Sequence, residues 1–336
     1  MQSIQERVEK KNLQYAKKGI IWGLLGGFLC GCPFFLQSMG MAAEPLASGA
    51  SLGILVIPVI FAFLQDIASF IVTFATLIVR GKSKECIRAI RTRPGKMLVF
   101  ASLFGGPVAS TSVVIGNYFA GPVYPAAISA VFPALGAVLS LVFLKERINS
   151  RSWIGILSCV IGAAVISWAP PTGEVYPLFY LGVAFAVLAA IGWSLEGIIS
   201  CAGMDFIDPE VAYTLSKFYA ILIHLCLTLP FVAGFGVRAY QLAVASIASP
   251  VMLFAFATGA LGGIGYMLYY KSNNACGAAR GMALNITYVP WGAVIGFLFA
   301  NAAITPLFVV GLIILMVGAL LVAGKPSELF NLRNIN

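Results

Sequence analysis

Residues 97–144 read MLVFASLFGGPVASTSVVIGNYFAGPVYPAAISAVFPALGAVLSLVFL and contain no Asp, Glu, Lys or Arg. As one helix, this stretch would be roughly 70 Å long, about twice the ~30 Å hydrocarbon core of a bilayer. It must therefore hold two membrane-spanning helices and a turn. A second uncharged stretch, 281–324, requires the same arrangement. These two stretches predict an all-α integral membrane protein.

The composition of the whole chain agrees with this prediction. Of its 336 residues, 60% are hydrophobic and only 10% are charged, whereas soluble domains average about 25% charged residues. The mean hydropathy is +0.96. A soluble enzyme, a nucleic-acid-binding protein and a secreted disulfide scaffold are excluded. The seven cysteines mostly lie in apolar runs and are interpreted as packing residues, so no metal site and no cofactor are predicted.

Apolar runs separated by charges, Gly and Pro divide the chain into ten predicted spanning helices. Their approximate ranges are 19–42, 50–79, 97–118, 122–144, 152–170, 177–201, 211–234, 250–271, 277–299 and 304–324. These runs lack the two-residue alternation of a β-barrel. The uncharged stretch 19–43 is longer than the apolar core of a signal peptide, so we expect it to remain as the first spanning helix.

The positions of Lys and Arg predict the orientation, because cytoplasmic loops are enriched in these residues. With the amino terminus inside, 20 of the 21 Lys and Arg residues fall in inner segments, and Arg238 falls outside. We therefore expect cytoplasmic termini in a multi-pass protein of the plasma or inner membrane. The net charge of +9 is then a topology signal, and no nucleic-acid partner is predicted.

The two halves of the chain match when the first is shifted by 156 residues. Matching positions include Asn117 with Asn273, Gly121 with Gly277, Gly136-Ala137-Val138 with Gly292-Ala293-Val294, Gly155 with Gly311, and Gly162-Ala163 with Gly318-Ala319. A repeat of five helices enters the membrane from opposite sides in its two copies, which gives an inverted topology. Lys145-Glu146-Arg147 corresponds to Asn301-Ala302-Ala303, as expected if only the first triplet lies inside. The predicted organisation is a basic segment 1–18, repeats 19–170 and 177–324, and a cytoplasmic tail 325–336.

The region after the third predicted helix carries recognisable motifs. Gly121 to Pro133 follow the pattern Gly-Pro-x-x-x-x-Ala-Ile-x-x-x-x-Pro, and Leu144-Lys145-Glu146-Arg147, Trp153-Ile154-Gly155 and Gly162-Ala163 come after it. With these motifs, the chain resembles the EamA-type transporters of the drug/metabolite transporter (DMT) superfamily, over nearly its whole length and most strongly over 97–168. The resemblance implies ten helices in two inverted repeats. It also implies a substrate cavity around the first, third, fourth, sixth, eighth and ninth helices.

Two acidic residues lie well inside predicted spans, Asp66 and Glu196. A carboxylate at the centre of a membrane helix costs about 2.5–3.5 kcal/mol on insertion scales, so each acid needs a function or a partner. Glu196 shares a helix face with Trp193, and the two suit an ammonium group through ion pairing and cation–π attraction. A contact of Glu196 with Lys217 or Arg280 is an equal alternative. Asp66 fits a hydrogen bond to a neighbouring helix as well as proton coupling, for which Glu196 is the other candidate.

The resemblance also favours further polar residues as substrate ligands, because they lie in the helices that it implies around the cavity. These residues are Asn117, Tyr266, Tyr270, Asn285, Tyr288 and Trp291. Several of them can equally cross-link helices, since each polar group in the membrane needs a partner. His224, the only histidine, lies in the seventh helix, which the resemblance places at the periphery. A structural or lipid-adjacent position is favoured for it over a proton relay.

Together these features predict a secondary-active or facilitative transporter of a small polar organic metabolite, preferably an amino acid or an amine, working by alternating access. The chain lacks the phosphate-binding Gly-x-x-x-x-Gly-Lys-Ser/Thr loop, so ATP is not expected to drive transport. Proton coupling and a homodimer stay open. The alternatives are a carrier of quaternary-ammonium or other cationic drug-like solutes, a carrier of nucleosides or sugars, and a non-transporting membrane sensor or scaffold. No enzyme is predicted, because the motifs of intramembrane aspartyl and zinc proteases are missing.

Overall fold

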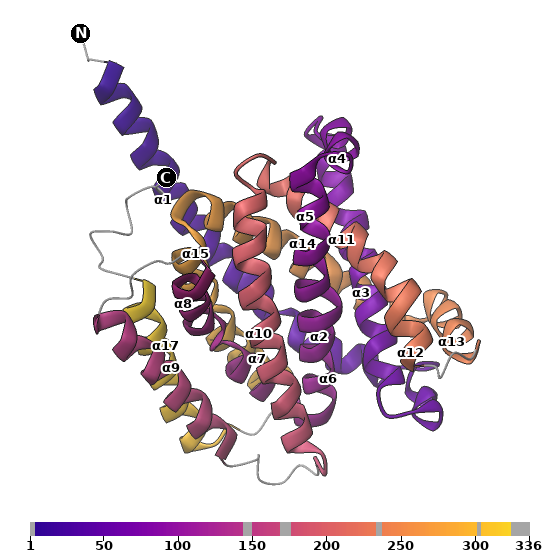
Figure 1. Ribbon diagram of the computed structural model, residues 1–336. Helices are drawn as coiled ribbons and strands as arrows, with labels where there is room; N and C mark the ends of the chain where they lie inside the picture. Colours follow the sequence, from indigo (N-terminus) through magenta and orange to yellow (C-terminus); the bar gives the residue numbers. More distant parts are fainter. Residues whose placement is uncertain (1–3, 144–149, 169–175, 233–236, 301–303, 324–336) are drawn as a thin grey trace.

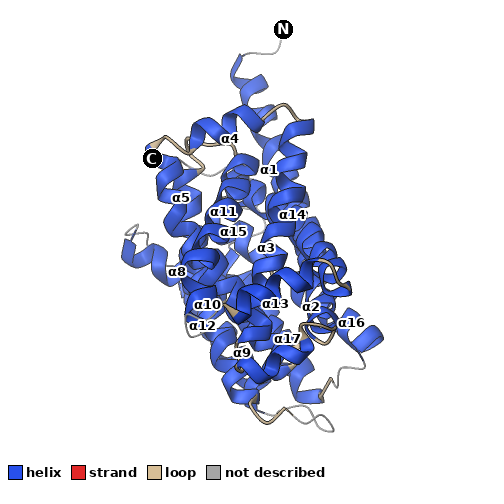
Figure 2. Ribbon diagram, turned by 90° about the vertical axis from the view of Figure 1, so that its right-hand side faces the viewer, coloured by secondary structure: helices blue, strands red, loops and turns tan. Residues whose placement is uncertain are grey.

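The computed structural model describes residues 4–143, 150–168, 176–232, 237–300 and 304–323, and every regular element in these ranges is a helix (Figures 1 and 2). The first half contains α1 (Ile4–Gly31), α2 (Pro33–Met41), η1 (Ala47–Leu52), α3 (Val56–Val79), α4 (Ser83–Ala89), α5 (Arg93–Leu103), η2 (Phe104–Ser110), α6 (Thr111–Ala120), α7 (Tyr124–Ser129), α8 (Phe132–Phe143) and α9 (Ser150–Trp168). The second half contains α10 (Phe179–Gly203), α11 (Pro209–Ile223), η3 (His224–Thr228), α12 (Leu229–Val232), α13 (Arg238–Ile247), α14 (Pro250–Cys276), α15 (Ala278–Asn285), α16 (Tyr288–Ala300) and α17 (Pro306–Ala323). The predictions for Lys145-Glu146-Arg147, Asn301-Ala302-Ala303 and the tail 325–336 lie outside the described residues.

Most of these helices combine into stretches that suit a membrane. Among the described residues, eight helical stretches are long and apolar enough to span it: Leu13–Met41, Val56–Val79, Arg93–Ala120, Ser150–Trp168, Phe179–Gly203, Pro209–Val232, Pro250–Cys276 and Arg280–Phe299. Shorter apolar helices, Tyr124–Leu139 and Pro306–Val322, coincide with the other two predicted spans. The prediction of an all-helical, multi-pass membrane protein is confirmed. The full ten-helix inverted repeat stays a prediction.

Three spanning stretches begin with the same local signal, a capping side chain with a proline in the first turn after it. Thr92, Asp208 and Ser249 each accept a hydrogen bond from a backbone N–H of the first turn, at 3.1, 2.9 and 3.2 Å. Proline suits the first turn of a helix because the N–H that it lacks has no partner within the helix there. These caps explain why α5, α11 and α14 start where they do.

Two apolar stretches are interrupted at matching positions. A two-residue turn, Ala130-Val131, separates α7 from α8, and Ile286-Thr287 separates α15 from α16. The two turns differ by the same 156 residues that align the halves of the sequence. The helices before them end alike, since Gly121 and Gly277 have φ of 78° and 89° and donate their N–H groups four residues back at 3.0 and 2.9 Å. Only glycine adopts such a backbone readily.

Helices α9 and α17 lie side by side (Figures 1 and 2) and contact each other through four glycines. A Cβ added at Gly162 would lie 2.7 Å from the carbonyl oxygen of Gly311, and one added at Gly318 would lie 2.7 Å from that of Gly155. Small residues allow backbones to approach this closely within a membrane. The crossing is symmetric in the register of the halves, because Gly155 corresponds to Gly311 and Gly162 to Gly318.

Replacing Gly162 by alanine should destabilise this crossing. The new Cβ would lie 2.6 Å from the backbone nitrogen of Leu315, so the helices must separate, and overpacking of this kind costs about 1–3 kcal/mol. We expect a lower apparent melting temperature of the purified protein in detergent. Gly292→Ala is the matched control, because the nearest atom to its Cβ is 3.4 Å away. Equal melting temperatures for the two variants would contradict the close crossing.

Candidate functional site

A cavity lies between helices of both halves. Its lining comes from α1, α2, α3, η2, α6, α8, α10, α11, α14, α15 and α16, and is rich in aromatic, amide and hydroxyl groups. The lining residues are Cys30, Pro33, Phe34, Gln37, Gln65, Asp66, Ser69, Ser110, Val113, Phe132, Trp193, Tyr213, Lys217, Thr258, Gly259, Gly262, Gly263, Tyr266, Tyr269, Asn285 and Tyr288. Small-molecule sites are concave and mostly apolar, with a few polar groups placed among the apolar ones, and this lining has that character.

Aromatic rings form much of this lining. Phe34 stacks on Tyr288 with centroids 5.7 Å apart, and Tyr213 stacks on Tyr266 with centroids 5.6 Å apart. Trp193 contacts the rings of both Tyr266 and Tyr288. Ring faces are electron-rich and attract cations. The cavity therefore offers an apolar surface with a preference for positive charge.

Asp66 of α3 and Lys217 of α11 bring opposite charges to the cavity. Lys217 Nζ lies 2.7 Å from Asp66 Oδ1, and their side chains are only 10% and 1% exposed. Nε2 of His224 lies 3.6 Å from the other oxygen, Oδ2. His224 Nδ1 and the Thr228 hydroxyl share a hydrogen bond of 2.6 Å. Because an unpaired buried charge is strongly unfavourable, Lys217 explains how Asp66 is tolerated in the membrane.

Of the two positions expected for His224, structural or lipid-adjacent, the lipid-adjacent one is wrong. Its side chain is fully buried, and its ring lies 6.0 Å from that of Phe63 on α3. Helices α11 and α3 pack against each other, so this face of the seventh predicted span points toward Asp66 instead of toward lipid. The peripheral position of a helix does not make all of its faces lipid-exposed.

Glu196 of α10 is buried but does not belong to the cavity lining. The hydroxyl of Tyr270 donates a hydrogen bond of 2.8 Å to Glu196 Oε1. The backbone of Gly105 in the π-helical segment η2 lies directly against the carboxylate, so that a Cβ at this position would collide with it. Within the described part of the chain, no hydrogen-bond partner reaches Oε2. Lys217, one of the two cations expected beside Glu196, pairs with Asp66 instead.

Known proteins share sequence features with this chain. Residues 17–168 match the EamA-like transporter family. This match confirms, over that range, the resemblance that the sequence motifs predict. Protein LicB of Haemophilus influenzae is 23% identical over 307 residues, which cover 90% of this chain and 96% of LicB. The chain thus carries, over residues 17–168, a region similar to the EamA-like transporter family within a multi-pass membrane protein.

A solved crystal structure also has this fold. It matches with a TM-score of 0.53 and 17% sequence identity, and the match covers 92% of this chain and 97% of that chain. At this identity the likeness concerns the fold alone. Because the match covers most of both chains, the helical arrangement is shared well beyond the EamA-like range.

Several sequence-predicted ligands meet at the cavity. Trp193, Tyr266, Asn285 and Tyr288 line it together with Asp66. The Tyr288 hydroxyl also lies 3.0 Å from that of Ser129, which joins the two interrupted spans. Their role in substrate binding stays a prediction, but these side chains share one space.

Three other candidates lie outside the lining. Asn117 donates hydrogen bonds to the carbonyl of Phe34 at 2.8 Å and to Gln37 Oε1 at 3.0 Å, so it cross-links α6 to α2. Tyr270 contacts Glu196. Trp291 is 44% exposed and packs its ring edge-on against a residue of α1, with centroids 5.0 Å apart. These contacts match the helix-bridging alternative for Asn117.

Sequence reasoning missed Gln37, Gln65, Ser69, Tyr213 and Lys217 as lining residues. A signal was present for Lys217, because it lies inside the predicted span 211–234 and not in an inner loop. A lysine in a spanning helix should be paired with an intramembrane acid. The neutral polar residues beside Asp66 had no comparable signal, since they can find hydrogen-bond partners on any neighbouring helix.

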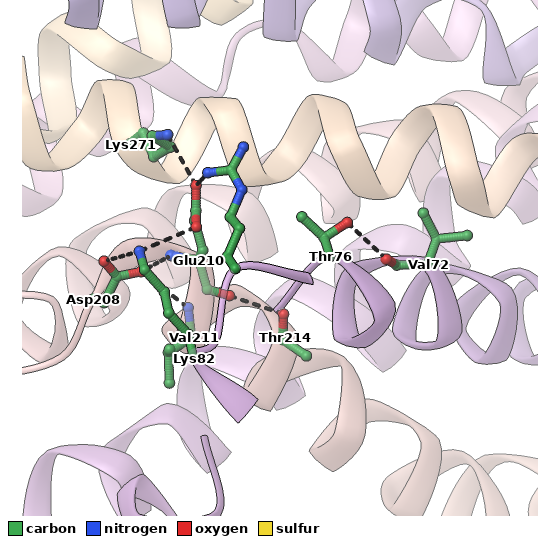
Figure 3. A network of polar contacts seen from close by, with 9 residues as sticks. Val72, Thr76, Lys82, Asp208, Glu210, Val211, Thr214 and Lys271 are labelled. Atoms are coloured by element: carbon green, nitrogen blue, oxygen red, sulfur yellow. Dashed lines mark hydrogen bonds and ion pairs between the residues drawn. The ribbon is translucent and has the colours of Figure 1, made fainter. Parts of the chain in front are cut away.

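A second polar cluster lies away from the cavity, around Glu210 near the start of α11 (Figure 3). Glu210 forms ion pairs with Arg80, with Lys82 at 3.2 Å and with Lys271 at 2.9 Å, and its own side chain is 4% exposed. Asp208 holds Lys82 at 2.7 Å. Burial acts to lower the pKa of Lys82, but its hydrogen bonds to Asp208 and Glu210 outweigh burial and raise that pKa above its ordinary value. Lys82 is therefore a permanent cation in this cluster.

This cluster joins the two halves of the chain. Arg80 and Lys82 follow α3, whereas Glu210 and Lys271 belong to α11 and α14. Lys271 also lies over the ring of Trp22 in α1, 4.4 Å from its centroid. Residues from α11, from α14 and from the segment after α3 therefore meet at one buried carboxylate, and the ion pairs of Glu210 with Arg80 and Lys82 cross from one half to the other.

Glu210→Gln should loosen this end of the bundle. The substitution removes the charge that three cations share, and loss of such a partner costs about 1–3 kcal/mol. We expect a lower apparent melting temperature in detergent, with a smaller difference between wild type and variant at high salt. Glu85→Gln, at an exposed position of α4, is the control and should change neither. A Glu210→Gln protein as stable as the control would show that the ion pairs contribute nothing.

Proposed function

We propose that this protein is a secondary-active or facilitative carrier of a small amine-bearing metabolite. The observation that supports this most strongly is that the cavity already holds an ammonium group, that of the Lys217 side chain. Lys217 Nζ lies 2.7 Å from the Asp66 carboxylate and 5.6 Å from the centre of the Tyr213 ring. A solute ammonium needs the same two partners, a carboxylate and aromatic faces.

Alternating access between two inverted repeats is the proposed mechanism, with the repeats at 19–170 and 177–324. The matching turns at Ala130-Val131 and Ile286-Thr287 support it, because carriers of this kind bind substrate at interrupted helices in corresponding positions of their halves. Contacts between elements support it too. α1 packs on α14, α15 and α16, and α10 packs on α5, η2, α6, α7 and α8, so the first helix of each half packs on the third and fourth spans of the other.

The ion cluster around Glu210 fits the role of a closure at one end of the cavity. Opening that end requires α1 and α3 to move away from α11 and α14, and the ion pairs of Glu210 resist this separation. Ion pairs suit such a closure, because their cations can reach water when they part. Asp66 and Glu196, the two buried acids, are the candidates for proton coupling.

Transport itself is tested with purified protein in two assays. A thermal-shift panel would contain tetramethylammonium, ethylammonium, amino acids and glucose, and a binding solute raises the apparent melting temperature. Counterflow of labelled tetramethylammonium in proteoliposomes then separates a carrier from a sensor or scaffold. Glucose is the neutral control. Stabilisation by glucose alone, or by none of these solutes, would contradict an amine carrier.

The aromatic lining gives a paired test of the site. Trp193→Leu removes a cavity ring, and losing a cation–π contact of about 1–2 kcal/mol should raise the Kd for tetramethylammonium about tenfold. Trp291→Leu makes the same chemical change at an exposed position and should leave the Kd within about twofold. The measurement is a thermal-shift titration of each variant. Equal effects of the two substitutions would place the cation elsewhere.

A further inference from the structure

Asp66 and Lys217 are the two charged residues among the described residues that line the cavity. They come from different halves of the chain, α3 and α11. A purely structural ion pair needs no contact with a solute space, yet both partners face one here. The charged group that a solute ammonium would seek is therefore already occupied by an ammonium of the protein itself.

A second buried carboxylate, that of Glu196, is the alternative partner for Lys217. The Oε2 atom of Glu196 is buried without a hydrogen-bond partner among the described residues. Asp66 Oδ2 faces His224, and the backbone of Gly106 lies close to it. Adjacent residues of η2 thus approach the two carboxylates, since Gly105 lies against Glu196 and Gly106 lies close to Asp66. Asp66 holds Lys217, whereas Glu196 has an oxygen without a hydrogen-bond partner among the described residues.

Resting on the amine function proposed above, we propose that Lys217 is a tethered competitor for the substrate ammonium at Asp66. In the empty carrier, Lys217 neutralises Asp66. When a substrate amine enters, its ammonium takes the place of Lys217 Nζ at Asp66, and the lysine turns toward Glu196. No covalent bond forms or breaks in this exchange, and Asp66 has a cationic partner at every stage.

This arrangement has a consequence for the transport cycle. A carrier that returns empty must carry its buried charges through the membrane without substrate, and an unpaired Asp66 would oppose that step. Lys217 removes the obstacle. It also lowers the apparent affinity for the amine, because only the fraction of molecules with Asp66 released can bind.

The experiment compares binding and two modes of transport in Lys217→Gln. Without its competitor, Asp66 should bind tetramethylammonium and ethylammonium about tenfold more tightly, as for a site free only about a tenth of the time. Counterflow of tetramethylammonium should persist, since the carrier has substrate bound in both directions of the exchange. Net efflux into substrate-free buffer should fall at least about fivefold, because the empty return is impaired. Weaker binding, or equal loss of counterflow and efflux, would overturn the proposal.

A second variant covers the case in which Lys217→Gln does not fold. Lys217→Arg keeps the cation and holds a carboxylate through two parallel hydrogen bonds. It should therefore compete better, weaken binding of both probes and retain net efflux relative to counterflow. Binding as tight as in the wild type would contradict competition at Asp66.

The same measurements separate this proposal from the function on which it rests. If the wild type neither binds nor exchanges the probes, the amine carrier is rejected. Ethylammonium still tests the competition directly in that case, because it copies the end of the lysine side chain. Ethylammonium should raise the melting temperature of Lys217→Gln more than that of the wild type. An equal rise in the two proteins would overturn the tethered competitor, whether or not the wild type transports the probes.

Discussion

Hydrocarbon solvates neither backbone amides nor charges, and this constraint governs the structure of the protein. The described backbone meets it by being helical almost throughout. The charges meet it by pairing, as Lys217 does with Asp66 at 2.7 Å and as three cations do with Glu210.

With no hydrophobic drive between helices in lipid, close packing must hold the bundle together. Glycine supplies it where α9 meets α17, and again where α1 meets α14 and α15. A Cβ on Gly23 would lie 2.7 Å from Leu284, and one on Gly26 would lie 2.9 Å from the backbone of Gly265. Surfaces of this kind are smooth, so they can slide past each other without the interlocking that large side chains would impose.

Much of this architecture follows from the sequence, because span length and charge placement are direct consequences of bilayer thickness. The register of 156 residues also reappears in the structure, at Gly121 and Gly277 and in the two turns that interrupt α7–α8 and α15–α16. The partners of the buried charges could not be derived in the same way. Lys217 was grouped with loop cations and His224 with the periphery, because sequence places a residue on a helix but does not say what the neighbouring helix brings to that face.

Asn117 illustrates the same limit for the site. An amide in a helix that lines a cavity can face the solute or a neighbouring helix, and only the three-dimensional packing decides between them. Its hydrogen bonds to α2 assign it to the scaffold. Trp193, Tyr266, Asn285 and Tyr288 were selected by the same reasoning and do face the cavity. The family resemblance did not imply the second and seventh helices, which contribute Asp66 and Lys217 to the lining.

The two carboxylate oxygens of Asp208 have different hydrogen-bond partners. Oδ1 accepts a hydrogen bond from the backbone N–H of Glu210 and so caps the first turn of α11. Oδ2 accepts a hydrogen bond from the ammonium of Lys82. The two bonds are independent, so the lysine can leave without unwinding the helix. In the proposed mechanism, separation of the halves at this end would therefore leave the cap of α11 in place, and α11 would move as one unit together with Lys217.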